Sequence, residues 1–416
     1  MKKQDKIHLI SGKIFIIRRN FMSTEPKVTE KKVVDFVIKT SKFCNLRCRY
    51  CYEFNDLGNR EMISSTQLDQ MYHHIADYYG ALDHPTEINF VWHGGEPLIH
   101  SPEFYWKTFE SQKEIFRGRS VSIINSVQTN LTVLDEARLQ LLKTGFDSVG
   151  VSLDLFGGLR VNQSGRDSVA LVLKNLDRLQ AKKIPFGCIT VLTQLNRPYI
   201  EAIFRFYEQM EVSFRILPLF KGAFDSQHIG FEITPYEVLE TYKTLVDLWF
   251  ESDRFVMVHP IVEHIEQALR HRCDRSRVTL YDKRQWESIF LVNTDGQIYS
   301  YADAYAGPSQ GNIFTTPMET LLNGKAHQLV IQAAEDRLRS TCHHCPYLGS
   351  CDGYPVAEGS VEYNEYDEQG AIRCIVTHGI LRHIEERLDQ ARQAGMAELP
   401  TEHFTHWEKS ALSCAV

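Results

Sequence analysis

Between residues 34 and 222 the hydrophobic positions follow two alternating patterns. Short runs rich in Val, Ile and Phe are typical of buried strands, and longer stretches with apolar residues every three to four positions are typical of helices. The strand candidates begin at Val33, Glu87, Val121, Ser148, Phe186 and Val212. Six strands separated by helices predict an α/β fold, an open or partial (β/α)6 barrel whose functional loops follow the C-terminal ends of its strands.

The pattern changes beyond residue 222. Residues 223–272 predict a helical connector, whose first helix is opened by Thr234 ahead of Pro235. Residues 273–395 combine cysteines, a β-hairpin with Asp295-Gly296 at its turn and a charged helix, and we interpret them as a small second domain. Residues 1–33 are interpreted as a short N-terminal extension and residues 396–416 as a C-terminal tail.

Composition narrows the class of protein. The 416 residues are 43% hydrophobic and 24% charged, which is ordinary for a globular chain. No run approaches the roughly 18 consecutive apolar residues of a membrane span, and no signal peptide is evident. The net charge of -7 argues against a dedicated nucleic-acid binder. Ten cysteines without a secretory signal favour the cytoplasm, where closely spaced cysteines more often bind metal than form disulfides.

Seven of the cysteines fall into two groups. The groups are Cys44, Cys48 and Cys51, and Cys342, Cys345, Cys351 and Cys374. Three thiolates at steps of four and three residues can hold three irons of a cubane iron–sulfur cluster and leave the fourth iron open. Four thiolates can close every iron of such a cluster. Zinc is the alternative for both groups, and His343 and His344 keep it open for the second.

The segment CNLRCRYC at residues 44–51 resembles the CX3CX2C motif of the radical S-adenosylmethionine (SAM) enzymes, including the aromatic Tyr50. The resemblance implies a partial six-fold barrel and a [4Fe-4S] cluster whose open iron is chelated by SAM. It also implies reductive cleavage of SAM to a 5′-deoxyadenosyl radical. Gly94-Gly95-Glu96-Pro97 is similar to the family's GGEP element, which implies close backbone approach at the glycines and a hydrogen bond from the SAM ammonium to Glu96.

The same resemblance implies further site residues at the strand ends. Gln128 and Asn130 belong to a QTN segment expected near the SAM ribose and the substrate. Ser152 is expected to contact SAM, and Asp154 to face the substrate as a candidate catalytic group.

Two arginines follow the fourth predicted strand. Either Arg160 or Arg166 is expected to pair with the SAM carboxylate, although the surrounding loop departs from the family pattern. A solvated loop charge is the alternative for each.

The second cysteine group is similar to the C-terminal SPASM domain of radical SAM enzymes, and it matches the complete ligand set of the outer auxiliary cluster. The inner cluster's positions are largely lost, because Tyr301 and Pro355 stand where relatives carry Cys and Cys273 alone cannot anchor it. We therefore predict one auxiliary [4Fe-4S] cluster. Asp303 is a candidate base by analogy with sulfatase-maturing relatives, against a plain loop Asp.

These features imply a radical SAM maturase that abstracts a side-chain hydrogen from a precursor peptide and forms an intramolecular cross-link. Carbon–carbon (cyclophane) closure is favoured, because the inner cluster, a possible thiolate-binding site, is missing. The alternatives are thioether formation, an anaerobic sulfatase-maturing (formylglycine-generating) enzyme, a small-molecule dehydrogenase or epimerase, and a non-catalytic iron–sulfur or zinc-binding regulator. Expected partners are the precursor peptide, an electron donor such as flavodoxin or ferredoxin, and a separate leader-peptide-binding protein.

Overall fold

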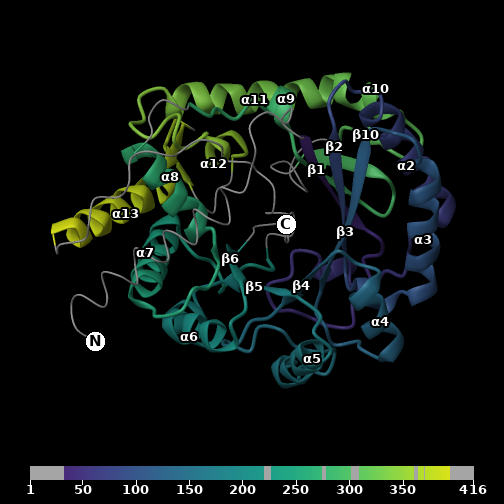
Figure 1. Cartoon of the computed structure of the whole chain (residues 1–416), viewed down its shortest axis with the longest axis horizontal. Coiled ribbons are helices and arrows are strands. Elements are labelled where there is room, and N and C mark those ends of the chain that lie inside the picture. Colours follow the sequence, from purple (N-terminus) through teal and green to yellow (C-terminus); the bar gives the residue numbers. More distant parts are fainter. Residues whose placement is uncertain are drawn as a thin grey trace.

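Six parallel strands in sequence order form the centre of the computed structural model, which describes residues 32–219, 226–273, 278–300, 309–359, 364–369 and 371–393 (Figure 1). The strands are β1 (Lys32–Lys39), β2 (Thr86–His93), β3 (Val121–Thr129), β4 (Ser148–Ser152), β5 (Gly187–Leu192) and β6 (Phe214–Pro218). The helices that follow β1 to β5 are α2 (Ser65–Tyr79), α3 (Pro102–Ile115), α4 (Glu136–Thr144), α5 (Val169–Ala181) and α6 (Ile200–Met210). The predicted open βα barrel is confirmed.

The two faces of each strand have different partners. On β1, the Phe36 ring packs against Tyr79 of α2, so this side chain points outward to the helical layer. Val37 points the opposite way and joins Val91 and Leu291 in a separate small cluster inside the barrel. Because side chains alternate along a strand, Lys39 faces the interior as well.

The sheet continues beyond the six barrel strands on both edges. The predicted hairpin is present as β8 (Ile289–Val292) and β9 (Gln297–Ser300), and β8 pairs parallel to β1. β10 (Gly311–Asn312) adds to β9, and β7 (Val258–His259) pairs parallel to β6. The hairpin therefore covers the edge of β1, whose backbone groups would otherwise lack strand partners.

The remaining elements form two groups beside the barrel (Figure 1). One group packs α13 (Val376–Gln393) against α7 (Pro235–Glu251) and α8 (Ile261–Cys273). The other contains α9 (Lys283–Trp286), α10 (Met318–Asn323), α11 (Lys325–Cys342), α12 (Tyr354–Ala357) and the ribbon of β11 (Asn364–Tyr366) and β12 (Ile372–Cys374). Short 3-10 turns complete the barrel loops, as η1 (Phe54–Asp56), η2 (Pro97–Ile99) and η3 (Arg197–Tyr199).

A buried ion cluster links α9 to α12. Lys283 lies 3.1 Å from Glu287 and 2.9 Å from Glu358, and the Tyr281 hydroxyl donates to Glu358 at 2.5 Å. The opposite charges and the added hydrogen bond compensate for the cost of burying these groups. The segment that leads into the hairpin is thereby fixed to α12.

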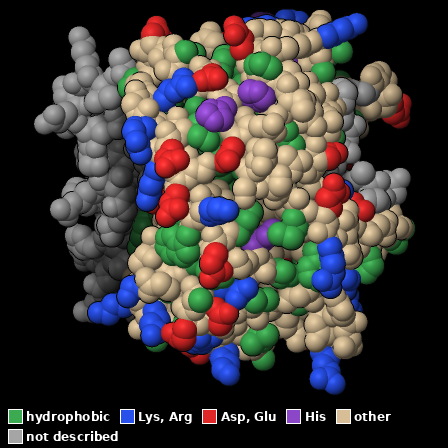
Figure 2. All heavy atoms as spheres, turned by 90° about the vertical axis from the view of Figure 1, so that its right-hand side faces the viewer, with side chains coloured by type: hydrophobic (Ala, Val, Ile, Leu, Met, Phe, Trp, Pro, Cys, Tyr) green, Lys and Arg blue, Asp and Glu red, His purple; other side chains and the backbone are tan. Residues whose placement is uncertain are grey.

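The outer surface around α2 and α3 mixes charges of both signs. Figure 2 shows basic and acidic side chains interspersed over this face. A surface that binds nucleic acid through its phosphates would concentrate Lys and Arg on one face. Within the described ranges, none of the helices has the length and apolar character needed to cross a bilayer.

The hairpin and the barrel share a core contact that can be tested. Phe290 of β8 is 1% exposed and stacks on Phe36 with ring centroids 5.5 Å apart. Phe290→Ala is expected to lower the free energy of unfolding by about 3–5 kcal/mol, because it removes buried apolar surface and leaves a cavity. Thermal unfolding followed by circular dichroism checks this, with Leu329→Ala as control because Leu329 is 52% exposed. Equal melting temperatures for the two variants would contradict a shared core.

Candidate active site

The first cysteine group lies in a loop directly after β1, at the edge of the sheet where the barrel strands end. Cys44 and Cys48 are buried, and the Cys51 N–H donates to the Cys48 carbonyl at 3.1 Å. The loop runs beside the segment that follows β4, because the backbone N–H groups of Arg47 and Arg49 donate to the carbonyls of Val161 and Leu159 at 2.6 and 2.9 Å. Two distant parts of the chain therefore hold the loop in shape.

The thiol groups of this loop lie in a buried, mutually repelling environment. Burial, with the negative charge of Glu96, raises the pKa of Cys44 to about 12. Burial, with the charge of Cys48, raises the pKa of Cys51 to about 12. The Cys44 sulfur accepts hydrogen bonds from the Leu46 N–H at 3.4 Å and the Asn130 side-chain amide at 3.7 Å. Thiols placed in this way ionise when a metal compensates their charge, so the donor set fits an iron–sulfur cluster.

The two glycines after β2 allow one backbone to approach another. The Gly95 N–H donates to the Ser41 carbonyl at 2.8 Å, and Gly94 has a φ of +115°. A Cβ atom on Gly94 would lie 2.3 Å from the Ser41 oxygen, and one on Gly95 would lie 2.2 Å from the Phe43 oxygen. Neither position accepts a side chain without moving the segment after β1 that leads into the cysteine loop. The glycines thus position Cys44.

The carboxylate of Glu96 is fixed by three protein donors. It accepts from the Thr129 hydroxyl at 2.7 Å, the Asn130 N–H at 2.7 Å and the Leu98 N–H at 2.9 Å. Burial raises its pKa, and these hydrogen bonds oppose that shift. A carboxylate has about four acceptor positions, so one remains for a cationic group. This placement fits the predicted contact with the SAM ammonium.

Asp154 belongs to a buried network with Tyr50 and Arg160. It accepts from the Tyr50 hydroxyl at 2.5 Å and from the Val191 N–H at 2.8 Å, and Arg160 Nη1 lies 3.6 Å from its Oδ2. Arg160 Nη1 also donates to the Tyr50 hydroxyl at 2.9 Å. Asp154 therefore anchors the cysteine loop to β4 and β5, whereas the sequence predicted a side chain that faces the substrate.

Several polar atoms at this end of the barrel have no partner among the described residues. Arg160 Nε is buried without a hydrogen bond, and so is Gln128 Oε1. The Gln128 amide donates to the Ser152 hydroxyl at 2.8 Å, which places these two predicted residues side by side on β3 and β4. Orphaned buried groups are costly unless a ligand or water satisfies them. Their position beside the cysteine loop fits a polar cofactor such as SAM.

Other predicted site residues lie elsewhere. Arg166 is exposed, on a turn where the Asn162 side chain accepts from the Arg166 N–H at 3.0 Å. Asp303 and Tyr301 lie outside the described residues, as does the side chain of Cys273. Of the two arginines, Arg160 is the one at the site.

Sequence reasoning missed a buried ion pair behind the cysteine loop. Lys39, at the end of β1, is 0% exposed and donates to the Glu53 carboxylate, which is also buried. Burial lowers the pKa of Lys39 to about 8, and the charge of Glu53 opposes this shift. The available signal was a lysine at the end of a strand rich in Val, Ile and Phe, since Lys is rarely buried unless paired.

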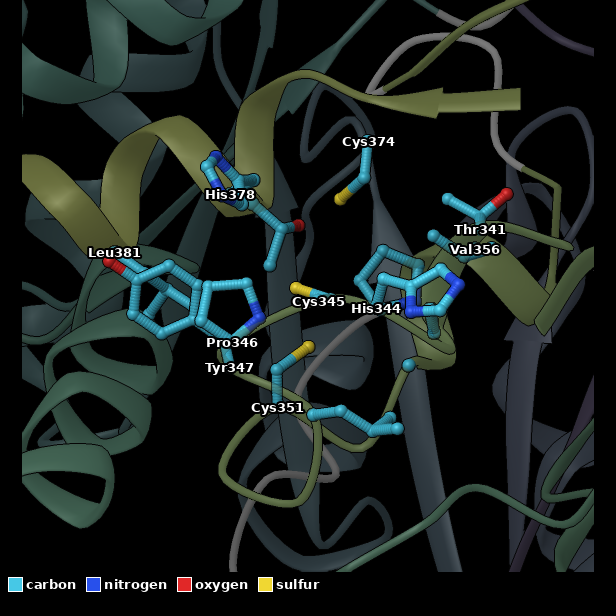
Figure 3. Close-up of a pocket in the computed structure, with 15 residues that line it drawn as sticks. Thr341, His344, Cys345, Pro346, Tyr347, Cys351, Val356, Cys374, His378 and Leu381 are labelled. Atoms are coloured by element: carbon cyan, nitrogen blue, oxygen red, sulfur yellow. The ribbon is translucent and has the colours of Figure 1, made fainter. Parts of the chain in front are cut away.

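The second cysteine group lines a cavity of about 280 Å³. Figure 3 shows the sulfur atoms of Cys345, Cys351 and Cys374 directed toward a common space. Cys342 ends α11 and Cys374 ends β12, so the tertiary structure brings the four positions together. Burial raises the pKa of Cys342 to about 12, and the neighbouring thiolates of Cys374 and Cys345 raise it further.

The arrangement of these thiols bears on the choice between zinc and a cluster. Within the described ranges, no three or more His, Cys, Asp or Glu side chains are grouped as ligands of a single metal ion. A zinc site needs four ligands that converge at about 2.3 Å from one centre, whereas a cubane presents a separate iron to each thiolate. His344 lines the cavity together with the four cysteines, so the cavity has ligands for either centre.

A parallel βα barrel with three clustered cysteines after its first strand defines an iron–sulfur enzyme of the radical SAM type. Residues 38–207 match the family model of the Radical SAM superfamily. The chain is therefore a radical SAM enzyme, and its cofactors include SAM and the [4Fe-4S] cluster of this family.

The curated relatives include sulfatase-maturating enzymes. A serine-type anaerobic sulfatase-maturating enzyme of Bacteroides thetaiotaomicron is 22% identical over 335 residues, 74% of this chain and 79% of the relative. A cysteine-type enzyme of Clostridium perfringens is 24% identical over 335 residues, 75% of this chain and 86% of the relative.

Two solved structures share the fold. The enzyme anSMEcpe with bound AdoMet and Kp18Cys peptide superposes with a TM-score of 0.67 at 19% identity, over 86% of this chain and 99% of that one. SuiB of Streptococcus suis bound to its precursor peptide SuiA superposes with a TM-score of 0.55 at 13% identity, over 80% and 75%.

The glycine contact predicts a specific loss of metal. Gly95→Ala is expected to displace the segment between β1 and the cysteine loop and to reduce bound iron by up to about four Fe per chain, the content of one cubane. Gly58→Ala is the matched control, because a Cβ atom there meets nothing within 4 Å. Iron analysis of the reconstituted proteins measures the effect. Full iron content in Gly95→Ala would rule out this role for the glycine.

Proposed function

We propose that this chain is a radical SAM maturase that modifies a side chain of a peptide substrate and closes an intramolecular carbon–carbon cross-link. The observation that carries the proposal is the presence of two separate thiol sites in one chain. The three-cysteine loop lies at the barrel end beside Glu96, Arg160 and Gln128, and the four-cysteine cavity lies in the C-terminal part.

The bound cluster and SAM supply the abstraction of a hydrogen atom. The protein's own residues position these groups and keep them from water. Glu96 provides a fixed carboxylate for a cation, and Arg160 provides an unpartnered donor for a carboxylate. The Tyr50–Asp154 hydrogen bond holds the cysteine loop against the barrel wall.

The four-cysteine cavity supports the proposed oxidation of the substrate during cross-link formation. Cross-link formation removes two hydrogens from the substrate, one as an atom and the second as a proton and an electron. An electron acceptor is therefore needed in the same enzyme, and Cys342, Cys345, Cys351 and Cys374 are the residues that would hold it as an auxiliary [4Fe-4S] cluster.

Formylglycine generation on a sulfatase is the second candidate, and the curated relatives favour it. The sequence argues against formylglycine generation, because Tyr301 and Pro355 occupy positions where we expect cysteine ligands of a second auxiliary cluster. Thioether closure stays a third outcome that the same product assay distinguishes.

We further propose a cytoplasmic enzyme that receives electrons from a flavodoxin or ferredoxin. The eight cysteines of the described part whose side chains are placed are free thiols, which suits a reducing compartment. Peptide-bound structures among the fold relatives support a peptide partner. A pull-down with the precursor peptide tests whether a separate protein binds its leader segment.

Metal analysis tests the two-cluster proposal. The reconstituted protein is expected to hold about eight Fe per chain, because each cubane contains four. Cys48→Ala and Cys351→Ala are each expected to lose about half of this iron, since each removes a ligand of a different cluster. About twelve Fe per chain would indicate a third cluster at the inner auxiliary position. Zinc that is present in the wild type and absent from Cys351→Ala would exclude an electron acceptor at the four-cysteine site.

Product analysis tests the reaction. Enzyme, SAM and dithionite are incubated with short peptides encoded beside the gene, and the products are analysed by tandem mass spectrometry. The expected product lacks two hydrogens, does not fragment between the linked residues and does not react with a hydrazide. A hydrazide-reactive aldehyde would favour formylglycine, and a link that includes a cysteine sulfur would favour thioether closure.

The Cys48→Ala variant is the control for this assay. It is expected to form no 5′-deoxyadenosine. Undiminished 5′-deoxyadenosine from this variant would refute the proposed role of the cysteine loop.

A further inference from the structure

A buried ion pair closes the base of the loop that carries Cys44, Cys48 and Cys51. Lys39 ends β1, and its ammonium group donates to the carboxylate of Glu53, fourteen residues further on. All three cysteines lie between the two partners along the chain. The pair therefore joins the residue before the loop to the residue that follows it.

The pair lies in a protected space behind Cys51. Lys39 and Glu53 have side-chain exposures of 1% and 7%. The Lys39 ammonium lies 5.3 Å from the centre of the Tyr52 ring, and His93 is its register partner on β2. Charges act strongly there, because little water is present to screen them.

Glu53 also contacts the third cysteine through its backbone. Glu53 follows Cys51 by two residues, and its backbone is hydrogen-bonded to the Cys51 thiol. The position of Glu53 thus affects the placement of Cys51. Lys39 fixes that position through its ion pair.

A second pair, Lys42 with Asp56, provides a natural comparison. It has the same separation of fourteen residues and an N–O distance of 2.8 Å, but its side chains are 25% and 36% exposed. Ion pairs that water reaches contribute little to stability, whereas removing one partner of a buried pair leaves an uncompensated charge and is strongly destabilising. The two pairs span almost the same loop and differ mainly in burial.

We propose that Lys39 and Glu53 are a positioning pair for the SAM-binding cluster, with Glu53 fixing the Cys51 end of the loop and Lys39 supplying the positive charge that balances Glu53. The inference rests on the proposed function only in that the three cysteines hold a cluster. It requires no knowledge of the peptide substrate.

The charges of Lys39 and Glu53 are expected to affect the reduction potential of the SAM-binding cluster. Adding an electron to a thiolate-bound cluster is favoured by nearby positive charge and opposed by nearby negative charge. Lys39→Met leaves the Glu53 carboxylate unbalanced, so the potential is expected to fall. Glu53→Gln leaves Lys39 unbalanced, so the potential is expected to rise. The double variant is expected to return toward the wild-type value.

The experiment is an anaerobic redox titration of the full-length reconstituted protein, followed by electron paramagnetic resonance without peptide. The signal of the SAM-binding cluster is identified as the one lost in Cys48→Ala. Lys42→Met is the matched control and is expected to shift the potential much less, because Lys42 acts on Glu53 from a partly exposed position where water screens its charge. Iron content and circular dichroism are recorded for every variant.

The outcomes separate the possibilities. Wild-type potentials in both single variants, or an equal shift in Lys42→Met, would overturn the proposal. If Lys39→Met binds no cluster, iron content decides the question. Recovery of iron in the double variant would support the proposal. A double variant without iron, when Glu53→Gln alone holds iron, would overturn it. Absence of any Cys48-dependent cluster in the wild type would instead contradict the proposed function itself.

Discussion

The close approach of the Gly94-Gly95 turn to the end of β1 is the constraint on which the rest of the site depends. The backbone contact at Ser41 and Phe43 leaves no space for a Cβ atom and fixes where the cysteine loop begins. Glu96 follows directly after this turn, and its carboxylate accepts from the Thr129 hydroxyl and the Asn130 N–H. A loop of three cysteines becomes a defined site because its neighbours hold its backbone.

Burial of charge is the second theme of this structure. Lys39 with Glu53 and Arg160 with Asp154 lie on two sides of the cysteine loop, and each pair is almost closed to solvent. Buried pairs of this kind contribute little net stability, but they are costly to break. They therefore hold the loop in one geometry, which suits a protein whose residues must orient a reactive cofactor rather than supply the chemistry.

Much of the fold and part of the site were predictable from the chain. The short runs rich in Val, Ile and Phe predicted β1 to β6, and the spacing of Cys44, Cys48 and Cys51 indicated the cluster loop, because local pattern and local ligand spacing do not require tertiary information. Asp154 was different. The resemblance implied that it faces the substrate, and the structure shows its contacts with Tyr50, Arg160 and Val191, which come from segments distant in the sequence.

The sequence by itself determined the order of strands and helices and the two groups of thiols, since these follow from periodicity and from ligand type, and the resemblance of its motifs to a known family implied the class of cofactor chemistry. Only the tertiary structure decided that the hairpin of β8 and β9 extends the barrel sheet beside β1, that Arg160 rather than Arg166 reaches the site, and that Lys39 meets Glu53. The physical reason is that pairing partners across a sheet or a buried space are chosen by packing and burial, which a linear pattern does not encode.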